Sequence, residues 1–501
     1  MRASAVTRSP CSARAAERRR RWNESDVECG EKAVQGERPG VCGGPRRPAD
    51  SRALDRRART TVRHRPVNKG RSAPVRPACP NGAPYPPFPL RAVDLSFRRA
   101  AGGPLTMGVM FDFDGVAPPL ASLRARTTAR AHHIPSLRYR LGRNDRKAYA
   151  AGGFEPGAHV LQLLVPRRGQ FDVARRQMLT RPLPEGRPPW DLWLIRCAEE
   201  SFTVCFRSDH ALRDGIAAAS ILRLLIEDEP VDWSPRSPPS ARVGFRGVAA
   251  VLGQSARAMR PLTPAPAFAG AESGTPQLFH RDLPIALLRV AARAHGATVN
   301  DVYLAALSEA VHRRHQEGTH QGHPPMPVTV PLSVRGREQA TLVGNALVGV
   351  RLTLPCKDSG GVEGAVDAVT AQTRRLRAID YRGSARLVLD ALPRRAGARL
   401  ALRVAGAGPV GLLASNVDCG PALTLFGLPA TQAQLFSAPA DGLRCYTALT
   451  GYDSHARLTV VHDGSLPGMP RLGEHWVAAV RELADAPRPR VISGVERATG
   501  M

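Results

Sequence analysis

Lysine is scarce in this sequence, since only four of the 71 basic residues are lysine: Lys32, Lys69, Lys147 and Lys357. The formal net charge of +28 first suggests a nucleic-acid partner. An arginine excess together with abundant alanine, glycine and proline is instead typical of a GC-rich genome, so we give the charge no functional weight. Aromatic residues make up only 5%, and no aromatic stacking motif accompanies the arginines, which argues against specific nucleic-acid binding.

Paired cysteines, long apolar runs and a secretion signal are missing as well. The nine cysteines show no CxxC pair and no zinc-ligand spacing, so we expect reduced thiols in a cytoplasmic protein. No run of 18 apolar residues could form a spanning helix, and the N-terminus lacks the apolar segment of a secretion signal. His132 and His133 have no carboxylate or thiol partner at ligand spacing, so we predict neither a metal site nor a cofactor.

Composition divides the chain into four parts. Residues 1–90 are rich in Arg, Pro, Gly and Ser without periodicity and are predicted to be a disordered tail. Residues 91–240 and 277–501 show alternating strand and helix patterns and are predicted to be two subdomains, joined by a linker at 241–276. We therefore expect a chain shortened to begin near Arg91 to keep its fold.

The linker contains a predicted helix at 243–260. Phe245, Val248, Leu252 and Met259 lie near one stripe of it, with arginines among the polar positions. A basic amphipathic helix of this kind either lies on a membrane surface or packs between two domains, and the sequence leaves both interpretations open.

The stretch from Phe202 to Leu225 organises the chain. Residues 202–207 alternate apolar and polar side chains, which predicts a strand with one buried face. From Gly215 onward the apolar positions follow a helical period. His210 lies between them within HxxxDG, where a neutral imidazole could accept a proton from an alcohol or amine that attacks a carbonyl. A single histidine near an aspartate is also often an ordinary hydrogen-bonded residue.

The element resembles the HHxxxDG signature of the CoA-dependent acyltransferase superfamily. Further stretches are similar to the bacterial wax ester synthase/diacylglycerol acyltransferase family, and the order and spacing of all of them agree over about four-fifths of the chain. They are RPLPEGRPPWDLWLI at 181–195, TVNDVYLAALSEAVHRR at 298–314, VPLSVRG at 330–336 and GNALVG at 344–349. One departure stands out, because the first histidine of the family's pair is Asp209 here.

The resemblance implies an α/β fold, a mixed-sheet sandwich of two chloramphenicol-acetyltransferase-like subdomains with the active site in the cleft between them. It implies transfer of a fatty acyl group from acyl-CoA, as a substrate, to a long-chain alcohol or diacylglycerol, with a peripheral membrane or lipid-droplet surface as a further partner. His210 would be the general base. Asp214, Gly215 and Arg335 would be structural parts of the active site, with Asp214 and Arg335 within salt-bridge distance. The residues at the cleft or in the motifs would be Asp209, Asn300, Asp301, Gly344 and Asn345, and N-capping alone would also explain Asn300.

Two other functions remain open. A condensation-type or polyketide-tailoring acyltransferase would share His210 and use another acceptor, and a degenerate homologue would bind lipid without catalysis. A carboxylate that contacts His210 would raise the pKa of the imidazole and weaken the base, unless Asp209 points into a network of its own. We expect weak to moderate activity that rises with pH, is lost in His210→Ala and is kept or improved in Asp209→His.

Overall fold

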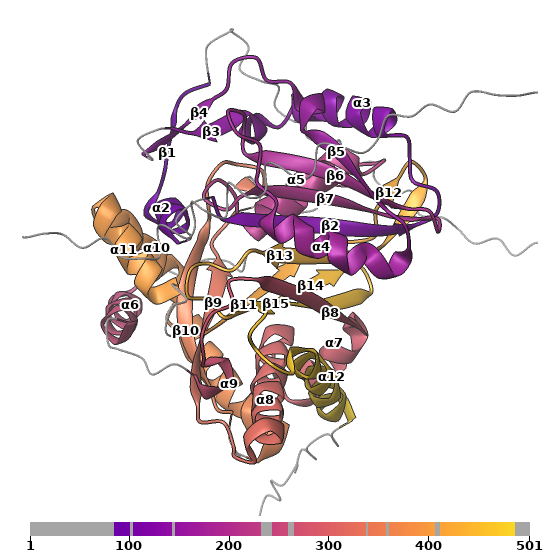
Figure 1. The fold of residues 1–501 in the computed structure, drawn as a ribbon. Coiled ribbons are helices and arrows are strands. Elements are labelled where there is room, and N and C mark those ends of the chain that lie inside the picture. The colour runs from indigo at the N-terminus through magenta and orange to yellow at the C-terminus, as the bar shows by residue number, and fades with distance from the viewer. Residues whose placement is uncertain are drawn as a thin grey trace, which may run out of the picture. The chain divides into compact units, whose positions relative to one another are not determined.

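The computed structural model describes residues 85–100, 104–142, 146–231, 243–258, 265–336, 339–356, 360–405 and 411–485. Two six-stranded sheets with helices packed on them make up most of this part of the chain (Figure 1). The mixed α/β class predicted from the sequence is confirmed.

The first sheet has the strand order β12-β13-β2-β7-β6-β5, and only its β5–β6 pair is parallel. Helix α5 packs on β2 and β7, α3 packs on α5, and α4 contacts β2 and β5. The elements are β2 (Thr106–Asp114), α3 (Leu120–Ala131), β5 (Val160–Val165), α4 (Phe171–Thr180), β6 (Trp190–Cys197), β7 (Ser201–Asp209), α5 (Gly215–Ile226), β12 (Thr424–Leu425) and β13 (Leu428–Ser437).

The second sheet has the order β10-β9-β11-β14-β15-β8. Helices α7, α8 and α12 pack on one another beside it, and α9 packs against α8 and β10. The elements are β8 (Pro276–Pro284), α7 (Ile285–Ala294), α8 (Val299–Thr319), β9 (Met326–Ser333), β10 (Leu347–Leu354), α9 (Gly361–Ala378), β11 (Leu412–Asp418), β14 (Cys445–Tyr452), β15 (His455–Asp463) and α12 (Met469–Asp485).

Three further helices lie together beside β10, as the left side of Figure 1 shows. They are α6 (Phe245–Ala258), α10 (Tyr381–Ala391) and α11 (Arg394–Ala405). The remaining connections contain the short helices η1 (Pro135–Arg138), η2 (Pro156–His159), η3 (Arg168–Gln170) and η4 (Pro266–Phe268). No helix in the described ranges is long and apolar enough to cross a membrane.

The C-terminal half of the sequence contributes a strand to the first sheet. β13 comes from the C-terminal half but pairs antiparallel with β2 of the first sheet, from Ala430 beside Phe113 to Ser437 beside Met107. This strand was not predicted, and it ties residues 428–437 into the N-terminal sheet. In the second sheet, β11 is parallel to both of its neighbours, β14 and β9.

Described secondary structure begins before the predicted boundary at residue 90. Phe88–Pro89 form β1, which pairs with β4 (Lys147–Ala150), and β4 pairs with β3 (Tyr139–Leu141). Leu90 is fully buried, and α2 (Ala92–Arg99) follows it directly. A chain shortened to begin at Arg91 would lose this strand and Leu90, so the predicted tail ends too late. Most of that tail, residues 1–84, lies outside the described residues.

Strand β7 is buried along its whole length, which corrects the predicted single buried face. Its polar positions have partners in the interior: Thr203 Oγ1 donates to Asp112 Oδ1, and Arg207 donates to Asp191 and to the carbonyls of residues 178 and 181. Buried polar groups are tolerated when they are hydrogen-bonded in this way. The strand is therefore a fixed support for the residue that follows it.

Candidate active site

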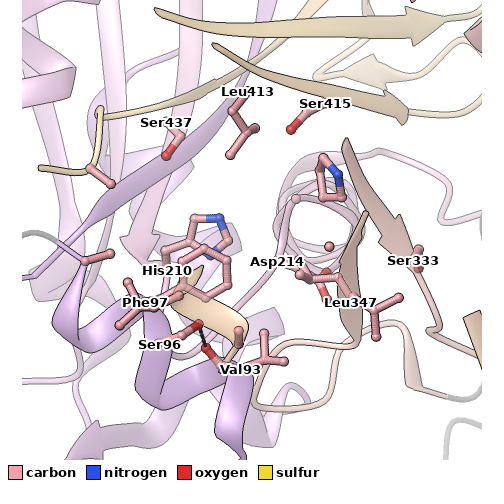
Figure 2. A pocket seen from close by; sticks show the side chains of 18 of the residues that line it. Val93, Ser96, Phe97, His210, Asp214, Ser333, Leu347, Leu413, Ser415 and Ser437 are labelled. Atoms are coloured by element: carbon pink, nitrogen blue, oxygen red, sulfur yellow. Dashed lines mark hydrogen bonds between the residues drawn. The ribbon is translucent and has the colours of Figure 1, made fainter. Parts of the chain in front are cut away.

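His210 occupies the turn between β7 and α5, as predicted. Its backbone N–H donates to the carbonyl of Leu105 at 2.8 Å, which ties the turn to the start of β2. Its side chain is half-buried and projects into a cavity (Figure 2). The rigid strand thus holds an imidazole at a fixed point in the interior.

Phe97 of α2 fixes the plane of the imidazole. Its ring stacks on the His210 ring with centroids 3.8 Å apart and an angle of 13° between the planes. Both rings are visible one behind the other in Figure 2. Phe97 lies in the stretch DLSF at 94–97 and was not predicted from the sequence to be a site residue.

Asn345 fixes the tautomer of the imidazole. Its Nδ2 donates to Asp94 Oδ1 at 2.9 Å and to the His210 carbonyl at 2.8 Å, and both of these atoms only accept. The amide oxygen Oδ1 therefore faces His210 Nδ1, 3.2 Å away, and accepts a hydrogen bond from it. With its proton on Nδ1, the ring keeps the lone pair of Nε2 free for a proton.

Asp94 holds Asn345 from the other side. Its Oδ1 accepts from the backbone N–H of Asn345 at 2.7 Å as well as from the side-chain amide. Burial raises the pKa of this carboxyl to about 6, although the hydrogen bonds from Asn345 oppose the shift. Asp94, Asn345 and His210 form a continuous chain of hydrogen bonds that the sequence alone did not connect.

The predicted contact between Asp214 and Arg335 is present. Arg335 Nη2 lies 2.6 Å from Asp214 Oδ2, and both side chains are almost fully buried. Asp214 also caps α5 by accepting from Ala217 N–H at 2.9 Å, and it accepts from Ala346 N–H at 2.8 Å. The pair therefore joins the start of α5 to the segment before β10.

Gly344 lies at the same connection between the start of α5 and the segment before β10. Its N–H donates to the carbonyl of Leu212 at 2.7 Å, and its carbonyl accepts from Arg335 Nη2 at 2.6 Å. Its φ of 88° lies in the left-handed region that favours glycine. A Cβ there would come within 3.2 Å of Asp94 Oδ2 and within 3.1 Å of the Phe88 ring.

Asp209 points away from His210 into a network of its own. Its Oδ1 accepts from Ala211 N–H at 2.9 Å, and its Oδ2 lies 3.9 Å from Arg98 Nη1. Its charge also acts on the buried Arg213. Burial lowers the pKa of this guanidinium to about 9, and the negative charge of Asp209 opposes that shift. Asp209 thus balances the charge of an arginine inside the DHALRDG element.

Burial lowers the pKa of His210 below the ordinary value of 6.5. Hydrogen bonds to its own backbone, to Asn345 and to the backbone of Arg213, and the charge of Asp214, raise the pKa and oppose this shift. The groups that shift this pKa do not include Asp209, so the alternative in which Asp209 points into a network of its own is the one that the structure supports. Desolvation of the imidazolium is the largest effect on the pKa of His210. At pH 7 the ring is neutral and able to accept a proton.

Gly215, Asn300 and Asp301 differ in how close they come to the cavity. Gly215 lines it, and a Cβ there would approach Leu435 and Val417 to within 3.2 and 3.3 Å, so the glycine permits close packing of α5. Asn300 and Asp301 are not among the lining residues.

Asn300 and Asp301 lie in the first turn of helix α8, and their contacts there account for their positions. Thr298 is its N-cap, so the capping role suggested for Asn300 is wrong. Asp301 is buried and accepts from the Thr298 N–H and from Thr373 Oγ1 at 2.7 Å. Asn300 accepts from Asn416 Nδ2 at 3.3 Å, and Asn416 lines the cavity.

The cavity beside His210 has a volume of about 180 Å³ and lies between the two sheets. Strands of both sheets line it together with α2, α5, α6, α10 and α11. Most of its walls are aliphatic side chains, and no lysine or arginine occurs among the described residues that line it. Figure 2 shows Leu413, Ser415 and Ser437 facing His210 across the space, with Leu347 and Ser333 beside Asp214.

Metal ligands and thiols were also considered among the described residues. No group of three or more His, Cys, Asp or Glu side chains in the described ranges could hold a metal ion. Cys205, five residues before His210, is fully buried, and burial raises the pKa of its thiol far above the ordinary value. A buried thiol of this kind is inert.

The fold is similar to those of a solved condensation domain and a solved wax ester synthase. The first condensation domain of the calcium-dependent antibiotic synthetase matches with a TM-score of 0.57 at 17% identity, over 81% of this chain and 98% of that chain. The wax ester synthase/diacylglycerol acyltransferase from Marinobacter aquaeolei VT8 matches with a TM-score of 0.56 at 18% identity, over 79% and 98%.

The sequence comparison agrees with the resemblance over part of the chain. Residues 104–268 match the profile of the wax ester synthase/diacylglycerol acyltransferase catalytic domain. A probable diacylglycerol O-acyltransferase of Mycobacterium tuberculosis is 27% identical over 233 residues, 40% of this chain and 50% of the relative. A putative one of the same species is 25% identical over 368 residues, 63% and 74%. The chain thus spans about half the length of the first of these relatives.

Proposed function

We propose that the protein is an O-acyltransferase that moves a fatty acyl group from acyl-CoA to a long-chain alcohol or a diacylglycerol. The observation that carries the proposal is a neutral imidazole with a free Nε2 beside an aliphatic cavity. The family of the domain at 104–268 supports the reaction class. The names of the mycobacterial relatives support diacylglycerol as one acceptor.

In the proposed mechanism, Nε2 of His210 accepts the hydroxyl proton as the acceptor oxygen attacks the thioester carbonyl. The tetrahedral intermediate then loses the CoA thiolate, and the imidazolium donates its proton to that sulfur. General acid–base help of this kind typically contributes about 10² to 10⁴ in rate. Phe97 and Asn345 hold the ring so that Nε2 remains the proton acceptor in every cycle.

The cavity walls indicate which parts of the substrates they contact. Aliphatic side chains from five or more elements can hold the acyl chain and the chain of the acceptor. The described lining residues offer no cation to the phosphates of CoA, so we place the nucleotide part of the donor outside this space. The Asp214–Arg335 pair has a structural role, because its polar atoms are occupied by each other and by backbone groups.

The test is transfer of radiolabelled palmitate from palmitoyl-CoA to hexadecanol, dioleoylglycerol and a long-chain amine, with products separated by thin-layer chromatography. We expect labelled ester with an alcohol or diacylglycerol, and none with His210→Ala. His133→Ala, which removes an exposed histidine, is the matched control and should keep wild-type activity. Labelled amide in place of ester would favour a condensation-type enzyme, and the absence of any product would favour a non-catalytic lipid-binding protein.

A further inference from the structure

Asp441 lies where the cavity beside His210 meets solvent. Of the described residues that line this cavity, only Asn416 and Asp441 are exposed. A side chain that lines a cavity and is also exposed stands at an opening of that cavity. The segment that carries Asp441 follows β13, and Ser437 at the end of β13 faces His210 across the space (Figure 2).

A tight turn fixes the backbone of Asp441. Leu443 N–H donates to the carbonyl of Ala440 at 2.9 Å, so Asp441 and Gly442 occupy the two central positions of the turn. Gly442 has a φ of 79°, the left-handed value that the third residue of a type II turn requires. The turn therefore presents the side chain of Asp441 from a defined position.

Helix α2 relates this turn to the reaction centre. The N–H of Asp441 donates to the carbonyl of Ala100 at 2.7 Å, and Ala100 follows directly after α2. Ala100 lies three residues after Phe97, a rise of about 4.5 Å along a helix. Because the ring of Phe97 stacks on His210, the turn is held about one helical turn from the imidazole.

Asp441 carries a charge that no cation of the cavity wall balances. The other carboxylate in the wall is Asp214, and Arg335 pairs with it. The described lining residues include no lysine or arginine. Burial raises the pKa of the Asp441 carboxyl, and in the described part of the chain no other group shifts it. An anionic group that enters at this opening therefore meets a negative charge.

Cations for the phosphates of acyl-CoA lie beside a second, smaller cavity of about 20 Å³. Its wall includes Arg91 and Arg386, together with Asp390, which is 3.6 Å from Arg386. The two cavities adjoin, since they share Val93, Leu347, Val348 and Leu389. A polyanionic donor is better accommodated on the side of the two arginines, so we assign the opening at Asp441 to the acceptor.

We propose that Asp441 determines the charge of the acceptor, so that its opening admits uncharged lipid alcohols and disfavours amphiphiles with a carboxylate or phosphate headgroup. An unpaired like charge is a common way to reject a wrong ligand without additional contacts to the right one. The selection among acceptors rests on the proposed function, whereas the selection among bound amphiphiles does not.

The experiment compares the binding of cis-parinaric acid and cis-parinaryl alcohol to the full chain, followed by probe fluorescence at pH 8 and low salt. The measured quantity is the Kd of the acid divided by the Kd of the alcohol. We expect Asp441→Asn to lower this ratio about three- to tenfold, the range for two charges about 7 Å apart near a protein surface. Asp441→Lys should lower it further, and added salt should lower it in the wild type.

Asp453→Asn is the matched control, because Asp453 is an exposed turn residue outside the cavity wall. It should keep the wild-type ratio. A ratio that stays at the wild-type value in both Asp441 variants would overturn the proposal. An equal fall of the ratio in Asp453→Asn would overturn it too, since the net charge of the surface would then be the cause. Failure of the wild type to bind either probe would also overturn it.

Activity measured in parallel separates this proposal from the proposed function. The acceptors are 1-palmitoylglycerol and its 3-phosphate, and the readout is the ratio of their kcat/KM values with palmitoyl-CoA. If Asp441→Asn narrows both this ratio and the binding ratio, both proposals are supported. If the binding ratio changes but the wild type acylates no acceptor, the selection by Asp441 stands and the proposed function fails. If the wild type acylates both acceptors and neither ratio changes, the proposed function stands and the selection fails.

Discussion

Removal of the Arg335 guanidinium should destabilise the protein strongly. Arg335→Met leaves the carboxylate of Asp214 buried without its cation, although Ala217 N–H and Ala346 N–H still donate to it. Breaking a buried ion pair by removing one partner costs about 3–5 kcal/mol. The carbonyls of residues 342 and 344 also lose a donor, so we expect a loss at the upper end of this range.

The assay is urea unfolding followed by circular dichroism, with the free energy of unfolding extrapolated to water. Arg471→Met is the control, because Arg471 pairs with Glu317 on the surface and its side chain is 64% exposed. An exposed pair contributes about 1 kcal/mol or less. The double variant Asp214→Asn/Arg335→Met keeps an N-cap side chain and removes the buried charge, so it should be more stable than Arg335→Met alone. A loss in Arg335→Met no larger than that in Arg471→Met would refute this reasoning.

Three further predictions concern the surroundings of His210. The kcat/KM for ester formation should rise with pH around a midpoint below 6.5, because burial lowers the pKa of the base and activity is lost as pH falls through that pKa; a pH–rate profile with a higher midpoint would contradict this. Asp209→His should lower the urea midpoint, since Arg213 loses its nearby opposite charge, while the activity per folded molecule stays near wild type; an unchanged midpoint would show that Arg213 does not need Asp209. Asp94→Asn should lower kcat by up to about a hundredfold by displacing Asn345, and an unchanged kcat would remove Asp94 from the positioning of His210.

The sequence predicted the elements that a local pattern of apolar residues marks. The change from a period of two to a helical period at 202–225 identified β7 and α5. The same patterns predict helices at 119–131, 171–179 and 471–484 and strands at 326–332 and 347–354, which the structure shows as α3, α4, α12, β9 and β10. The sequence did not predict β13, because Gln432 and Gln434 interrupt the apolar pattern although both are buried. Burial of these amides depends on packing between the sheets, which no local pattern reports.

The candidate site also contains residues that a short sequence pattern predicted and residues that only the three-dimensional structure brings together. His210 follows from a short motif, and the Asp214–Arg335 contact came from the family resemblance. Phe97 and Asp94 could not be linked to His210 by spacing, since Asp94 reaches Asn345 across 251 residues of sequence. The direction of Asp209 also depends on where Arg98 and Arg213 lie, so the motif alone could not decide whether its carboxylate contacts His210.

The most direct test of the account compares initial rates of ester formation from palmitoyl-CoA and hexadecanol by the wild type and His210→Ala at saturating substrate. The circular dichroism spectra and urea midpoints of both proteins establish that the fold is kept. We predict that the variant loses at least about a hundredfold in kcat, the lower limit for general-base help. A folded His210→Ala protein that forms ester at the wild-type rate would contradict the assignment of His210 as the base.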